Sequence, residues 1–135
     1  MSSSDSILIV TGETVHSDNL AATASYLKLR PVCCRTLDAA GVLASRQQYG
    51  MVFCDDVLPD GDFRGVIAET SRSDTCTPVI VVSERDDWNF YLEVMKAGAF
   101  DYVMFPAGPG EIERIACAAI RESGRQVRTA ACTAA

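Results

Sequence analysis

Five short stretches of almost continuous apolar residues recur along the chain. They are residues 7–10, 32–36, 51–54, 79–82 and 100–104. Nearly continuous apolar character, rather than strict alternation, is typical of strands that are covered on both faces of a parallel sheet. The pattern therefore predicts five strands of a buried parallel sheet.

The segments between and after these strands carry apolar residues at helical spacing, three or four positions apart. Such a stripe packs against the core. Strand and helix alternate five times, and right-handed crossovers place helices on both faces of a parallel sheet. The expected fold is therefore α/β, a doubly wound five-stranded parallel sheet with five helices. The residues of the stripes are Val15, Leu20, Ala24 and Leu27; Val66, Ile67 and Thr70; Leu92 and Met95; and Ile112, Ile115 and Ala119.

One domain accounts for the whole length, because 135 residues lie close to the size of a single domain, about 150 residues. A chain of this length is expected to hold no effector domain beside it. The apolar rhythm ends after Glu122. Residues 1–124 are therefore expected to form the domain, and residues 125–135 a tail, either a frayed helix end or the start of a linker.

The charge and the apolar runs exclude several classes of partner. Twelve Lys and Arg against eighteen Asp and Glu give a net charge of −6, which disfavours nucleic acid and anionic membrane surfaces. The longest aliphatic runs, 7–10 and 79–82, are far shorter than the ~20 apolar residues of a membrane helix. The first residues also lack the basic and apolar regions of a secretory signal. We expect a cytoplasmic protein with no direct nucleic-acid or membrane partner.

The six cysteines show no CxxC spacing. Several lie inside apolar stretches, which favours reduced thiols in an intracellular protein. The adjacent Cys33 and Cys34 are expected to pack as small apolar residues rather than to form a redox pair.

Chemistry is expected where the strands end, because sites in open parallel sheets lie at the carboxyl ends of the strands. Asp55 follows the third apolar stretch, and Asp56 continues it into a polar loop. A carboxylate at that position can be a nucleophile toward a phosphoryl donor, although an isolated Asp is more often a helix cap or a loop acid. Ser83 ends the next stretch, where its hydroxyl would reach a phosphoryl group on Asp55, and Tyr102 lies in the last stretch. The grouping favours a site.

Three motifs resemble those of receiver domains in two-component response regulators. Asp-Asp-Val-Leu-Pro at 55–59 is similar to the phosphoacceptor stretch Asp-x-x-Leu-Pro, Pro-Val-Ile-Val-Val-Ser at 78–83 to the strand that ends in Ser or Thr, and Met-Lys-Ala-Gly-Ala-Phe-Asp-Tyr at 95–102 to the segment before the last strand. The resemblance spans about residues 6 to 122. It implies a flavodoxin-like strand order 2-1-3-4-5, Asp55 as phosphoacceptor, and Ser83 and Tyr102 as switch residues. The third motif is most similar to receivers that precede transcription-activating ATPase modules.

The family's catalytic set is incomplete in this chain. Receivers place two acids after the first strand to hold Mg²⁺, where this chain has Thr11 and Gly12, with Glu13 at the usual third position. Receivers also have Lys before the last-strand proline, where Phe105 precedes Pro106. Phosphoryl transfer depends on cations that neutralise the developing charge. We therefore expect a degenerate pocket without a resident metal, in which Mg²⁺ binds only if the site functions, with Phe105 as apolar cover. The resemblance also implies a cis peptide bond before Pro106.

The segment after the fourth stretch carries Trp88, Phe90 and Tyr91. Three rings within one helical turn cannot all face the core, and exposed aromatic residues are enriched at interfaces. By the resemblance, the fourth helix, fifth strand and fifth helix form the output and dimer surface. We expect protein partners there: a sensor histidine kinase, an output module or a second copy of the chain.

The expected function is that of a non-enzymatic receiver domain in two-component signal transduction, which acts by protein contact although the phosphoacceptor Asp55 is present. Two alternatives stay open. One is a fully phosphorylatable receiver in which Glu13 replaces the lost metal ligands. The other is a flavodoxin-like FMN or phosphate binder, because residues 11–14 resemble part of the flavodoxin phosphate loop. His16, the only histidine, is expected on the helix surface, since a lone histidine forms neither a triad nor a zinc site.

Overall fold

The computed structural model describes residues 5–71 and 77–134, with the backbone alone for residue 109 and residues 123–134. Within these residues, five parallel strands form one sheet in the order β2-β1-β3-β6-β7. Counted along the main sheet, this is the order 2-1-3-4-5, so the predicted topology is confirmed. The strands are β1 (Ser6–Val10), β2 (Arg30–Cys34), β3 (Met51–Asp55), β6 (Val79–Ser83) and β7 (Asp101–Met104).

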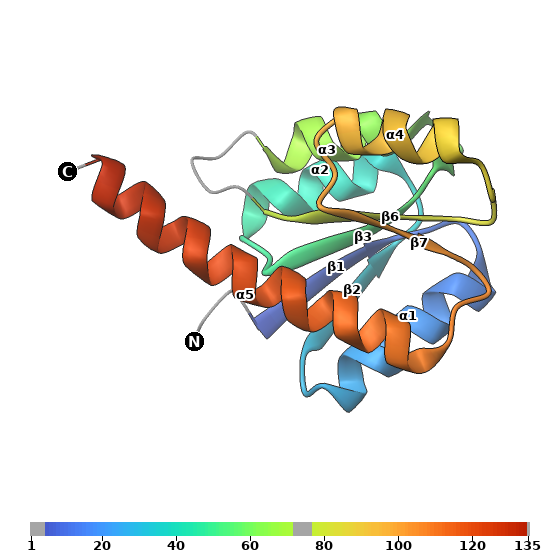
Figure 1. Ribbon diagram of the computed structural model, residues 1–135, viewed down its shortest axis with the longest axis horizontal. Helices are drawn as coiled ribbons and strands as arrows, with labels where there is room; N and C mark the ends of the chain where they lie inside the picture. The colour runs from blue at the N-terminus through green and yellow to red at the C-terminus, as the bar shows by residue number, and fades with distance from the viewer. Residues whose placement is uncertain (1–4, 72–76, 135) are drawn as a thin grey trace.

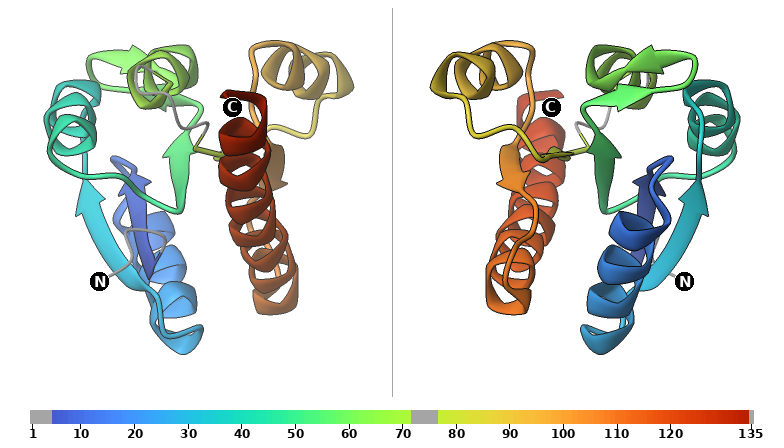
Figure 2. Two further views of the ribbon diagram at one scale, coloured as in Figure 1. Left: turned by 90° about the vertical axis from the view of Figure 1, so that its left-hand side faces the viewer. Right: turned by 90° about the vertical axis from the view of Figure 1, so that its right-hand side faces the viewer.

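Helices cover both faces of the sheet (Figures 1 and 2). One face packs against α1 (Thr14–Tyr26) and α5 (Pro109–Ala134). The other packs against α2 (Leu37–Arg46), α3 (Phe63–Thr70) and α4 (Trp88–Lys96). The layers explain why the apolar stretches are continuous. Neighbouring strand residues point to opposite faces, and each face has its own helix layer to pack against.

Burial differs between the centre and the edges of the sheet. Every residue of β1, β3 and β6 is buried, whereas the edge strands β2 and β7 are partly exposed. The centre therefore presents the end of β3 to the loops after β1 and β6, which flank it.

The segment after β3, which the sequence predicts as a loop, contains a short hairpin of two strands. Strands β4 (Val57–Leu58) and β5 (Gly61–Asp62) pair antiparallel. Between them, Asp60 accepts hydrogen bonds from the backbone N–H groups of Leu37 (2.7 Å) and Asp38 (3.0 Å). These bonds from the N–H groups of Asp38 and Leu37 hold the pKa of Asp60 below its usual value. The hairpin therefore anchors the start of α2.

The last helix continues beyond the predicted boundary at residue 124. Its backbone is helical to Ala134, and Figure 1 shows its C-terminal part projecting past the sheet. The division into a domain and a tail stays a prediction. Within the described residues, no helix combines the length and hydropathy of a membrane-spanning segment.

Among the described residues, four cysteines are free thiols: Cys33, Cys34, Cys54 and Cys117. Cys33 is exposed, which contradicts its expected packing, because the edge strand β2 leaves that side uncovered. Cys34 is half-buried, and burial raises the pKa of its thiol to about 11. Little reactive thiolate is therefore present at Cys34 at neutral pH.

Candidate functional site

The candidate site is built around Asp55, the last residue of β3, which is only 6% exposed. Its Oδ2 accepts hydrogen bonds from the Thr11 hydroxyl (2.7 Å) and the Gly12 N–H (3.0 Å). Its Oδ1 lies 3.3 Å from Nδ1 of His16. Both oxygens of the carboxylate are thus engaged by protein groups.

The loop after β1 is fixed in place by its own hydrogen bonds. The Thr11 oxygen accepts from the backbone N–H of Glu13 (3.0 Å), so this hydroxyl joins the loop to Asp55. On the outer side, the Arg35 guanidinium donates to the carbonyl of Gly12 (2.9 Å). The Glu13 side chain is exposed. The loop therefore directs the Thr11 hydroxyl and the Gly12 N–H toward Asp55, and the Glu13 carboxylate toward solvent.

His16 is the site residue that the sequence interpretation missed. It is buried, with 7% of its surface exposed, so the expected surface position is wrong. The buried stripe of α1 is His16, Leu20 and Ala24, whereas Val15 is 68% exposed. His16 lies four residues before Leu20, and this helical spacing could have predicted that both face the core.

The His16 ring has partners on three other elements. Besides Asp55, its Nε2 lies 3.2 Å from Oε2 of Glu84, in the loop after β6. The ring also packs edge-to-face on Phe105, with centroids 4.5 Å apart. Phe105 is buried and the peptide bond to Pro106 is cis, as predicted. An aromatic ring therefore covers this side of the site.

Ser83 is buried and its hydroxyl donates to Asp56, with 2.8 Å between Oγ and Oδ2. The other Asp56 oxygen accepts from the N–H of Val57 (2.9 Å). The structure thus pairs Ser83 with the second acid of the motif, not with Asp55. Asp56 is half-buried; it lies in the site but is held apart from Asp55 by different partners.

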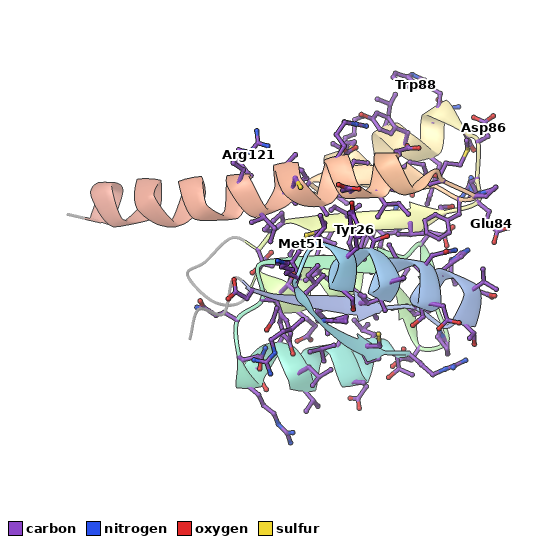
Figure 3. The ribbon with its side chains drawn as sticks, turned by 90° about the horizontal axis from the view of Figure 1, so that it is seen from below. Tyr26, Met51, Glu84, Asp86, Trp88 and Arg121 are labelled. Carbon is purple, nitrogen blue, oxygen red and sulfur yellow. The ribbon has the colours of Figure 1, made fainter. Side chains whose placement is uncertain are left out.

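The aromatic residues of α4 divide between core and surface. Trp88 is 69% exposed and stacks on Tyr91, with centroids 5.1 Å apart. Figure 3 shows Trp88 at the outer side of its helix. Phe90 is 6% exposed and packs edge-to-face on Phe63, so its expected place at an interface is wrong. Its position two residues into the helix turns it toward the sheet. The exposed Trp88 and the half-buried Tyr91 form the aromatic pair of α4.

Tyr102 connects this helix to the preceding loop. Its hydroxyl donates to the carbonyl of Arg85 (2.6 Å), and its ring lies edge-on to Tyr91. The switch role of Ser83 and Tyr102 stays a prediction. The contacts place both residues on the path from the site to α4.

The groups around Asp55 are not suited to bind Mg²⁺. This ion prefers oxygen ligands in octahedral geometry, but a hydroxyl and an N–H are directed at the carboxylate and Glu13 points outward. Among the described side chains, no cluster of three or more His, Cys, Asp or Glu is arranged to hold a metal ion. The site is organised by hydrogen-bond donors.

Comparisons with known proteins agree with this fold and these motifs, although no protein-family model matches the sequence. The response regulator protein PilR of Pseudomonas aeruginosa is 26% identical over 114 residues, which cover 84% of this chain and 26% of PilR. The transcriptional regulatory protein PmrA of Pectobacterium parmentieri is 25% identical over 117 residues, 87% of this chain and 53% of PmrA. The chain thus spans about a quarter to a half of these curated relatives.

Solved structures with the same fold are receiver domains. A CheY-like response regulator receiver from Methanospirillum hungatei aligns with a TM-score of 0.77 and 19% identity, covering 89% of this chain and 96% of that one. The receiver domain of a sensor histidine kinase from Pseudomonas aeruginosa, which has a magnesium ion coordinated in its active-site cleft, aligns with a TM-score of 0.73 and 24% identity, covering 85% and 96%. The fold is that of receiver domains. The curated relatives reported above are response regulators, to which this chain is similar over most of its length.

Proposed function

We propose that this domain transmits signals in a two-component pathway by protein contact, and that Asp55 is a poor phosphoacceptor. One observation carries the proposal. Both oxygens of a buried carboxylate are engaged by Thr11, Gly12 and His16. Hydrogen bonding to both oxygens holds the carboxylate in place and lowers the nucleophilicity of the oxygen that would attack phosphorus.

The electrostatics support the same conclusion. Phosphoryl transfer is catalysed by positioning and by cations that neutralise the developing charge. A unit charge pair at ~4 Å is worth about 4 kcal/mol at an effective dielectric near 20. Each 1.4 kcal/mol, approximately, is tenfold in rate. With Phe105 at the ammonium position and a donor set that does not fit Mg²⁺, the loss amounts to several powers of ten.

Protein contact is supported by the other end of the domain. Trp88, stacked on the half-buried Tyr91, offers apolar surface at the start of α4, and exposed aromatic residues favour protein recognition. The proposed partners are a sensor histidine kinase, an output module of a longer regulator, or a second copy of the chain through α4, β7 and α5. The proposed setting is cytoplasmic, and the domain is not an enzyme.

The flavin alternative gains no support from the loop at residues 11–14. The two groups that would cradle a phosphate, the Thr11 hydroxyl and the Gly12 N–H, are directed at Asp55. Absence of flavin fluorescence quenching on mixing with FMN is the expected result.

Incubation with acetyl phosphate and Mg²⁺, followed by intact mass measurement, tests the proposal. We expect the protein to remain almost entirely unmodified, as in the Asp55→Asn control. Asp56→Asn serves as the matched control, because it removes the adjacent acid and keeps Asp55. Stoichiometric phosphorylation that is lost in Asp55→Asn and kept in Asp56→Asn would establish the fully phosphorylatable alternative instead.

A further inference from the structure

His16 lies between two carboxylates that belong to different parts of the chain. Its Nδ1 is 3.3 Å from Oδ1 of Asp55 and its Nε2 is 3.2 Å from Oε2 of Glu84. The ring is buried, whereas the Glu84 side chain is 71% exposed. Figure 3 shows Glu84 at the rim of the molecule. The imidazole thus joins α1 to the buried end of β3 and to the exposed loop before α4.

The protonation state follows from the donor count. A neutral imidazole carries one N–H, and its other nitrogen is an acceptor; an ionised carboxylate only accepts. A neutral ring would leave one of the two contacts with facing lone pairs and no proton, whereas an imidazolium donates to both. We propose that His16 is doubly protonated in this structure and is the built-in cation of the Asp55 site, where it acts as a proton-dependent tie between α1 and the loop after β6.

The charged groups around the ring support this assignment. Asp55 approaches from β3 and Glu84 from the loop after β6, while Phe105, at the end of β7, is neutral. Two cations on the neighbouring loops have other partners: Arg35 donates to the Gly12 carbonyl, and Arg85 pairs with Asp87. Asp56, next to Asp55, accepts from Ser83. His16 is thus the group placed to neutralise Asp55.

Loss of one proton has a directional consequence. The ring then keeps a single N–H, and a buried acceptor without a donor costs about 1–3 kcal/mol. Asp55 is buried, but water can solvate the exposed Glu84, so the contact to Glu84 is the one released. Glu84 precedes Arg85, whose carbonyl accepts from Tyr102 and whose guanidinium lies 4.0 Å from the centroid of the Phe90 ring. Deprotonation therefore frees the loop that leads to α4 and Trp88.

The protonation state can be measured directly, because the chain has one histidine. Long-range ¹⁵N NMR at about pH 7 is expected to show both ring nitrogens protonated in most molecules. Glu84→Gln should lower the ratio of imidazolium to neutral ring by about threefold, the scale of an exposed ion pair. Asp55→Asn should lower it by more than about tenfold, since that partner is buried. A neutral tautomer in the unmodified protein, or a ratio that neither variant changes, would overturn the assignment.

Asp18→Asn is the matched control for these variants. Asp18 is an exposed acid two residues further along α1, on a different side of the helix from His16. Its neutralisation changes the net charge as much as Glu84→Gln does, and we expect the ring to keep its protonated fraction. An equal drop in Asp18→Asn and Glu84→Gln would show a general charge effect and contradict the tie.

Fluorescence of the single tryptophan, Trp88, reports on the tie itself. We expect its emission to change as rising pH removes a proton from the ring, and this change to disappear in His16→Gln. A change that persists in His16→Gln, or no change in the unmodified domain, would contradict the tie. The inference goes beyond the proposed function, because it concerns the resting site. Phosphorylation of Asp55 in the mass measurement would defeat the proposed function without changing either readout.

Discussion

The Asp55 site and the aromatic pair Trp88 and Tyr91 lie on connected segments of the molecule but use their side chains in opposite ways. At Asp55, each polar group is satisfied by a neighbour, and the described part of the chain contains no buried side-chain polar atom without a hydrogen-bond partner. At α4, apolar surface is left uncovered, and Trp88 is 69% exposed. The difference indicates a domain whose site stabilises its own fold and whose exposed aromatic surface lies at α4.

The largest expected contrast in stability is between His16→Ala and Trp88→Ala. Removing the buried ring deletes the donor to Asp55 and the packing on Phe105. We expect a loss of about 2–3 kcal/mol in the free energy of unfolding. Trp88→Ala removes an exposed ring and should change it by less than about 0.5 kcal/mol. Urea denaturation at neutral pH measures both.

His16→Asn provides the control for this contrast. The Asn amide retains an N–H donor near the Nδ1 position but loses the ring, so we expect a stability between those of the unmodified protein and His16→Ala. If Trp88→Ala proved as destabilising as His16→Ala, α4 would be a structural element like the site, and the comparison would fail.

A smaller contrast tests the loop at Thr11. Thr11→Val keeps the shape of the side chain and removes the hydroxyl that donates to Asp55. Because this acceptor is buried, we expect a loss of about 1–2 kcal/mol in the free energy of unfolding. The matched control is Thr23→Val on α1, whose exposed hydroxyl donates to the Asn19 carbonyl and whose loss should cost less than about 0.5 kcal/mol. Equal losses would mean that Asp55 does not depend on Thr11.

The same contrast explains which features the sequence could predict. The five strands were predictable because buried strands leave continuous apolar stretches, and the burial of every residue in β1, β3 and β6 accounts for the pattern. The hairpin of β4 and β5 was not, because two-residue strands are too short to show a period. Periodicity thus detects layers, and short local pairings escape it.

The side-chain partners at the site required the three-dimensional structure. The acid at Asp55 was predictable from its place at a strand end, but its pairing with His16 depends on which face of α1 the helix start turns inward. In the same way, the start of α4 at Trp88 decides that Phe90 is buried. The assignment of Ser83 to Asp56 depends on side-chain directions within one strand end, which no spacing rule encodes.

The smallest expected effect concerns the loss of stability in acid. The comparison is between two acids at helix starts, one at α4 and one at α2. Hydrogen bonds from backbone N–H groups, that of Phe90 first, hold the pKa of Asp87 at the start of α4 below its usual value, as those from Asp38 and Leu37 do for Asp60 at the start of α2. A lowered folded-state pKa means stability that is fully present above the unfolded-state value of about 3.9 and is lost as the pH falls through the folded-state value. Asp87→Asn and Asp60→Asn should therefore each show a smaller decrease in the urea midpoint between about pH 6 and about pH 3 than the unmodified protein does. Asp18 is an exposed acid within α1, so Asp18→Asn should leave that decrease unchanged. If Asp60→Asn reduced the decrease and Asp87→Asn did not, the cap of α4 would contribute nothing to acid stability. The α4 region would then be held by its aromatic packing alone.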